Sequence, residues 1–276
     1  MKKKQSKLKI KHYILITILI LIIIFISIRP SNDRNWTKDQ QVLSYAEFEG
    51  DLIHIYNIRN FTYQNTTNYE INYYNKTFNL SKLNSMNYIV EPFSDWGGSA
   101  HTFFSFEFDN NEYVAISIEI RKEIGESFSA TKGLFKQYEL MYVVGDEQDL
   151  IKLRTNYRKD DVYMYPVNTT KEKVQNLFVE MLERANTLKE NPEFYNTLTN
   201  TCTTNLKRHI NIITPDKIPF SFKILAPGYS DSLAYDLGLI QKQGTFEETK
   251  QYYKIDERAE ECGNCENFSE VIRHAN

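Results

Sequence analysis

The sequence predicts an α+β domain, in which a mixed or antiparallel sheet carries packed helices, behind one N-terminal transmembrane helix. Runs of alternating apolar and polar residues are spread over residues 52–145, as in half-buried strands. A helical apolar stripe follows at residues 171–189, and a long aliphatic run lies near the N-terminus. We therefore expect one large domain attached to a membrane segment.

The N-terminal segment has the composition of a membrane anchor. The first eleven residues hold six lysines and no acid, and only Thr17 and Ser27 interrupt the aliphatic run from Tyr13 to Ile28. A signal peptide starts similarly, but no small-x-small cleavage pattern follows. The lysines stay cytoplasmic by the positive-inside rule. We expect a single-pass cell-membrane protein with a cytoplasmic tail at 1–11, a transmembrane anchor at 12–29, a connector at 30–45 and an extracytoplasmic catalytic domain at 46–276.

The charge of the extracytoplasmic part argues against a nucleic-acid partner, because the sequence beyond residue 29 contains 36 acidic residues and only 26 basic ones. Of the three cysteines, Cys262 and Cys265 are spaced for a local disulfide, a redox pair or a zinc half-site. No second Cys or His pair accompanies them, so a surface disulfide or two unpaired thiols fits better. We expect no metal and no cofactor.

Strands and helices are then expected in order along the domain. Strand-like runs occupy 52–58, 69–78, 86–91 and 139–145, and a hairpin joins 102–108 to 113–120. Helical patterns occupy 146–157, 171–189, 202–213 and, in a shorter piece, 232–240; the second begins with a capping box at Thr169 and Glu172. The apolar segment Phe220 to Tyr229 is either a lipid-facing lip or a packed surface loop.

Cys202 is the candidate nucleophile. It opens the helical pattern at 202–213 and is flanked by small polar residues, whereas a core cysteine usually has apolar neighbours. A helix N-terminus lowers the pKa of a thiol, and its free N–H groups stabilise an oxyanion. A buried structural cysteine is the alternative, and the pattern alone does not decide between them.

His101 is the candidate general base, and Glu119 is the candidate group that orients its imidazole. His101 begins the first hairpin strand, on the face of Phe103 and Ser105, and lies opposite Glu119, Ile120 or Arg121 depending on the register. A nucleophile, a base and an orienting group need not be adjacent in sequence. Glu119 is equally interpreted as an ordinary exposed strand carboxylate.

Several motifs, in this order, resemble the Lnb N-terminal periplasmic domain family over roughly residues 35 to 240. They are Trp96-Gly97-Gly98 with Ala100-His101-Thr102-Phe103, Ile116 to Glu123, Gln137 to Leu140, Val143 to Asp149 leading to Leu153 to Arg158, and Asn196 to Asn205. The resemblance implies a circularly permuted papain-like fold, in which the histidine strand precedes the cysteine helix. It also implies that His101 and Cys202 are the catalytic pair, whereas Glu119 rests on strand geometry alone.

The activity that the resemblance implies is lipoprotein N-acylation. An acyl chain would pass from a phospholipid, through a thioester on Cys202, to the α-amino group of a lipoprotein N-terminal cysteine. Many family members carry further membrane segments after this domain and this chain does not, so a membrane-embedded partner protein is a further expectation. The alternatives are an extracytoplasmic amidase or peptidase that acts on cell-wall peptides, and a non-catalytic envelope module.

Overall fold

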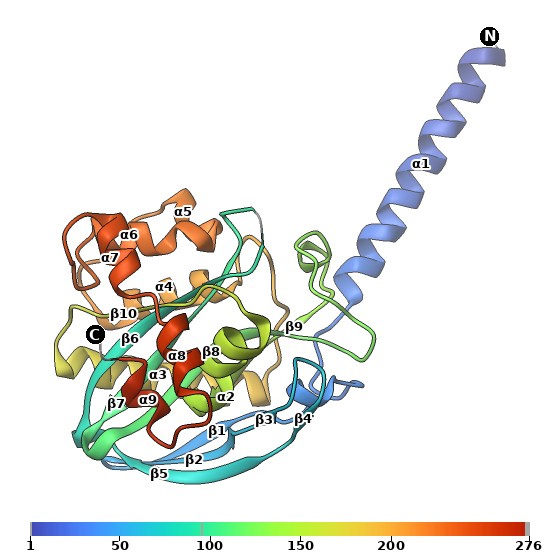
Figure 1. Ribbon diagram of the computed structural model, residues 1–276. Helices are drawn as coiled ribbons and strands as arrows, with labels where there is room; N and C mark the ends of the chain where they lie inside the picture. Colours follow the sequence, from blue (N-terminus) through green and yellow to red (C-terminus); the bar gives the residue numbers. More distant parts are fainter. Residues whose placement is uncertain (1, 95, 274–276) are drawn as a thin grey trace.

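The centre of the protein is a mixed sheet of eight strands, flanked by helices (Figure 1). The computed structural model describes residues 2–94 and 96–273, and of residues 2–10 only the backbone. The strand order is β1-β2-β9-β8-β7-β6-β10, with β5 paired to β2 outside this path. Neighbouring strands are antiparallel except for β2 and β9. The mixed α+β class predicted from the sequence is confirmed.

The strands of the sheet are β1 (Tyr45–Glu49), β2 (Leu52–Arg59), β5 (Tyr73–Asn79), β6 (Leu83–Pro92), β7 (Ala100–Phe108), β8 (Glu112–Arg121), β9 (Glu139–Gly145) and β10 (Tyr163–Pro166), and a separate small pair is β3 (Thr62–Tyr63) with β4 (Tyr69–Glu70). The helices are α1 (Lys2–Ser27), α2 (Glu147–Lys152), α3 (Lys171–Glu190), α4 (Cys202–Ile213), α5 (Phe222–Leu225), α6 (Ser230–Asp236), α7 (Phe246–Tyr252), α8 (Asp256–Cys262) and α9 (Phe268–Val271).

Both faces of the sheet are buried. One face packs against α3, α4 and α6, through residues such as Phe106, Phe178 and Leu206. The other packs against α2, α8 and α9, through residues such as Phe103 and Phe268. Figure 1 shows α8 and α9, in red, beside α2 on this second side. The hairpin strands β7 and β8 therefore present two inward faces, and their polar side chains cannot simply point into water.

The predicted helices and strands are largely found. Strand β9 and helix α4 have the expected bounds, and the expected helix at 146–157 is α2 followed by a short π-helix (Leu153–Arg158). The capping box predicted at Thr169 and Glu172 is wrong, because α3 begins after Thr170, whose side chain accepts a hydrogen bond from the Lys173 N–H. Strands β1, β3 and β10 and helices α5, α7, α8 and α9 were not predicted.

Helix α1 extends away from the domain (Figure 1), and its apolar side chains from Tyr13 to Ile26 are exposed. The expected transmembrane anchor at 12–29 is not supported. Within the part of the chain that the structure describes, no helix has both the length and the apolarity needed to cross a membrane.

The two C-terminal cysteines are joined. Cys262 and Cys265 form a disulfide across a Cα–Cα distance of 5.3 Å, so of the two states that the sequence favoured, a disulfide or two unpaired thiols, the disulfide is the one found. Cys202 is a free, buried cysteine.

We predict that Phe178→Ala destabilises the domain. Phe178 is fully buried, and its ring lies 4.9 Å from that of Phe106 and 5.4 Å from that of Phe108. Truncation leaves a cavity where α3 meets the sheet and should lower the free energy of unfolding by about 3–5 kcal/mol. Urea unfolding of the full-length protein measures this, with Phe48→Ala as the control, because Phe48 is 40% exposed. Equal small losses in both variants would contradict the prediction.

Candidate active site

Cys202 is the first residue of α4, a helix of twelve residues whose N-terminus is closed by a capping box. The Thr201 hydroxyl accepts from the Thr204 N–H, and the Thr204 hydroxyl accepts from the Thr201 N–H at 2.7 Å. Asn205 reinforces the turn by donating to the Thr201 carbonyl at 2.8 Å. The N–H groups of Cys202 and Thr203 have no acceptor within the helix. The first turn of α4 therefore presents N–H groups beside the thiol, where they can stabilise an oxyanion.

The thiol of Cys202 lies among buried side chains and is 8% exposed. Its sulfur is 3.7 Å from the hydroxyl of Thr203. Two buried phenols, those of Tyr88 and Tyr195, lie close enough to Cys202 to interact with it electrostatically. Burial is the main reason that the pKa of each is raised, and Cys202 raises both further. The sequence had marked the small polar neighbours of Cys202 along the chain. It had not indicated Tyr88, which reaches the site from β6.

His101 lies near the start of β7, where Ser117 and Glu119 of β8 face it. Its Nε2 is 2.7 Å from the Ser117 hydroxyl and 3.8 Å from a carboxylate oxygen of Glu119. Ser117 donates its only hydroxyl hydrogen to Glu119, at 2.9 Å. His101 must therefore donate from Nε2, which leaves Nδ1 as the nitrogen able to accept a proton. Nδ1 has no hydrogen-bond partner among the described residues.

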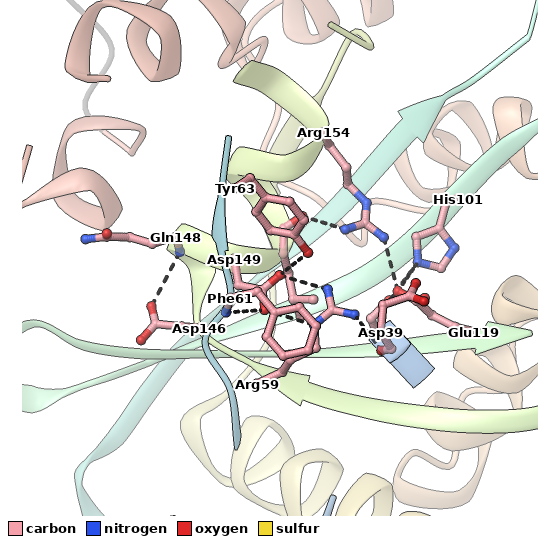
Figure 2. Close-up of polar contacts among 12 residues, drawn as sticks. Asp39, Arg59, Phe61, Tyr63, His101, Glu119, Asp146, Gln148, Asp149 and Arg154 are labelled. Atoms are coloured by element: carbon pink, nitrogen blue, oxygen red, sulfur yellow. Dashed lines mark hydrogen bonds and ion pairs between the residues drawn. The ribbon is translucent and has the colours of Figure 1, made fainter. Parts of the chain in front are cut away.

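Arg154 ties this group to a second carboxylate. It donates to Glu119 at 3.2 Å and to Glu91 at 2.5 Å, and Glu91, which is fully buried, also accepts from Arg158 at 3.2 Å. Figure 2 shows Glu119 between His101 and Arg154. Glu119 is therefore not an ordinary exposed strand carboxylate. It contacts both His101, as the prediction of an orienting group requires, and the buried guanidinium of Arg154.

The electrostatics of the cluster keep His101 neutral and Glu119 ionised. Burial, with the charge of Arg154, lowers the pKa of His101 to about 4. Burial alone would raise the pKa of Glu119, but Arg154 and His101 together hold it well below its usual range. A neutral imidazole with a free Nδ1 is the form that a general base requires.

A second ion pair supports the cluster from the adjoining strand. Arg59 of β2 donates twice to Asp149 of α2, at 2.9 and 2.8 Å, and Asp149 also accepts from the hydroxyl of Tyr63 at 2.9 Å (Figure 2). Asp149 therefore fixes α2, and with it the π-helix that carries Arg154, against the sheet. This arrangement joins segments far apart in the sequence, and no single motif indicates it.

His101 and Cys202 lie on opposite faces of the sheet. His101 stacks on Phe103, at a ring distance of 5.5 Å, on the face that packs against α2. Thr102, the next residue of β7, points to the other face and its hydroxyl is 3.1 Å from that of Thr203. Among the described residues, no hydrogen bond joins His101 to Cys202. Glu119 thus lies beside His101 as predicted, whereas the predicted contact between Cys202 as nucleophile and His101 as base is not present among the described residues.

We predict that His101 stays neutral down to about pH 4 in the folded protein. An NMR titration of its ring proton should have a midpoint near that pH, whereas a midpoint near the ordinary 6.5 would contradict the buried cluster. Because the folded pKa lies below the unfolded value, the unfolded chain binds more protons between these pH values, and stability falls as pH falls. His101→Gln should make that fall less steep, as urea unfolding at several pH values would measure.

The comparisons with known proteins give one family. No curated protein and no solved structure matches the chain. The model of the Lnb N-terminal periplasmic domain matches residues 69–228, from β4 to the turn before α6, which is more than half of the 276 residues. The histidine strand, the π-helix with Arg154 and the cysteine helix all fall inside this match. The chain belongs to the family of the Lnb N-terminal periplasmic domain.

Proposed function

We propose that the domain is an extracytoplasmic thiol acyltransferase with Cys202 as its nucleophile. The observation that carries the proposal is the free cysteine at the first turn of α4, held by the Thr201–Thr204 capping box with N–H groups beside it. Membership of a periplasmic family indicates an extracytoplasmic domain. The donor in this proposal is a phospholipid, and the acceptor is the N-terminal amine of a lipoprotein.

The chemistry has two steps. The thiolate of Cys202 attacks the ester carbonyl of the phospholipid, the C–O bond breaks, and the lysophospholipid leaves with a proton, so that a thioester remains. The acceptor amine then attacks the thioester, loses a proton and releases the Cys202 thiolate. In each step the carbonyl oxygen gains negative charge, which the N–H groups of the first turn of α4 would stabilise.

His101 is the base in this proposal, and its free Nδ1 supports the role. The Nε2–Ser117–Glu119 chain fixes the tautomer that keeps Nδ1 unprotonated. To act on Cys202, however, the first residues of β7 have to turn the imidazole to the face of α4, which breaks its contacts with Ser117 and Glu119. The contact between Thr102 and Thr203 places the two segments next to each other, and the change would also release the pairing of His101 with Glu91 of β6.

The placement of His101 and Cys202 on opposite faces favours a second candidate, a non-catalytic envelope module. In that case the His101 cluster and the α4 turn each stabilise the fold on their own side of β7. The two candidates differ in one observable, because only an acyltransferase forms a covalent acyl adduct on Cys202.

We predict a hydroxylamine-labile acyl adduct on Cys202 after the full-length protein is incubated with phospholipid vesicles. Intact-mass and peptide mass spectrometry detect it, and Cys202→Ala should carry none. His101→Gln should slow adduct formation roughly 10²-fold or more, the contribution of a general base. His54→Gln, which changes a half-exposed strand histidine elsewhere in the sheet, is the matched control.

Two results would count against this mechanism. An absent adduct on a thiol shown to be free would favour the non-catalytic module. An adduct that forms at the wild-type rate in His101→Gln would keep Cys202 as the nucleophile and remove His101 as its base.

We further propose that the aliphatic segment from Tyr13 to Ile28 holds the domain at the membrane. Its side chains from Tyr13 to Ile26 are exposed in the described part of the chain, and burying apolar surface in lipid is favourable by roughly 25 cal/mol per Å². Replacing both Ile20 and Ile23 by lysine should release the protein from sedimented or floated membranes. The control is Phe48→Lys, far along the chain in β1, and membrane retention of the double variant would refute the anchor.

A further inference from the structure

An apolar cavity of about 310 Å³ lies behind the first turns of α4. It is bounded by β6 and β7 of the sheet and by α3, α4 and α6, and its wall is mainly aliphatic, with Leu177, Leu206, Ile210, Leu233 and Ile240 among the lining residues. Its volume is at the lower end of the range of about 300–1,000 Å³ typical of small-ligand sites.

The polar groups of the cavity wall include a set beside Cys202. Thr203, the residue after Cys202, lines the cavity, and so do Tyr88 and Ser230, whose hydroxyls are 2.7 Å apart. The Cys202 sulfur is 3.7 Å from the Thr203 hydroxyl. The cavity therefore leads an apolar ligand to within one residue of the candidate nucleophile, on the face of β7 that carries Cys202 and not His101.

An exposed aromatic pair borders the same cavity. Ile218 and Ile224 line it, and between them Phe220 and Phe222 are 72% and 78% exposed. Lys207, which also lines the cavity, has its ammonium 6.0 Å from the ring centre of Phe220. Aromatic rings with a nearby lysine are typical of segments at a lipid surface, where the rings enter the acyl boundary and the ammonium faces anionic headgroups. In Figure 1, α5 lies at the top of the domain, and α1 leaves from the right-hand side and runs upward.

We propose that this cavity binds one acyl chain of a membrane phospholipid, and that Phe220 and Phe222 enter the bilayer to admit it. The inference rests on the proposed acyltransferase function and names the substrate site for it. The aliphatic wall would hold the chain, the lysine at its border would meet the headgroup phosphate, and the ester carbonyl would reach Cys202. The aliphatic wall supports an acyl chain as the ligand, and the exposed phenylalanines support the bilayer as the place from which the chain comes.

The first test compares a long-chain and a short-chain ester, p-nitrophenyl palmitate and p-nitrophenyl butyrate, as donors to the full-length protein, both dispersed in the same detergent. Ile210→Trp on α4 and Ala234→Phe on α6 each fill part of the cavity from a different helix. We expect each variant to acylate Cys202 from the palmitate roughly tenfold more slowly or worse, while the butyrate reaction is kept. Ile212→Trp, on the same helix but 54% exposed, is the matched control and should leave both reactions unchanged.

Wild-type rates with the palmitate in both filled variants would overturn the proposal, and so would an equal loss with both esters in both variants.

The second test measures ligand binding in the cavity independently of the acyl-transfer reaction. Cys202→Ala protein should bind a fluorescent fatty acid, and adding Ile210→Trp should weaken that binding while adding Ile212→Trp should not. If wild type forms no adduct but this binding pattern holds, the acyltransferase function fails and the cavity assignment stands; absence of binding overturns the cavity.

The phenylalanine pair is tested with vesicles. Phe220→Ser together with Phe222→Ser should slow acylation of Cys202 from vesicle phospholipid several-fold and leave the soluble butyrate reaction intact, because only delivery from the bilayer is lost. Ile71→Ser, which removes a 43% exposed isoleucine outside the cavity wall, is the control. An unchanged acylation rate with vesicles would show that Phe220 and Phe222 are not needed for phospholipid to enter the cavity.

Discussion

The side-chain alternation of β7 between two buried faces is the constraint on which the rest of the site depends. Successive residues of a strand point to opposite sides, so Thr102 reaches α4 whereas His101 and Phe103 lie under α2. In a sheet with one wet face, His101 would point into water. Here the second face is closed by α2, α8 and α9, so the polar groups on it need partners within the protein.

Those partners explain the two arginines that follow α2. A buried carboxylate is tolerated when it is paired and hydrogen-bonded, and Glu91 receives both Arg154 and Arg158. The π-helix at Leu153–Arg158 brings the two guanidinium groups to the sheet within one short segment. Arg154 also contacts Glu119, so the same side chain that neutralises Glu91 keeps Glu119 ionised beside His101. The orientation of the imidazole thus depends on packing at some distance from Cys202.

Patterns within a short stretch of sequence predicted the features that depend only on that stretch. Helix α4 and strand β9 were found with their bounds, because periodicity and capping residues set them within a dozen residues, and the proximity of Glu119 to His101 followed from hairpin register. Arg154, Ser117 and Tyr88 were missed as members of the site, although the first two stand in motifs of the family. Their roles require β6, β8 and the π-helix to meet. The polar C-terminal region likewise gave no sign that α8 and α9 would close the second face.

The separation of His101 from Cys202 divides the two requirements of acyl transfer between the two faces of one strand. The α4 face offers what a lipid substrate needs: an apolar cavity, exposed aromatic residues at its border and helix N–H groups beside a free thiol. The α2 face offers what proton transfer needs: a neutral imidazole with a fixed tautomer. Neither set is complete alone. His101 and Thr102 are adjacent in β7, so the two sets of groups meet at one pair of neighbouring residues and are separated by the sheet itself.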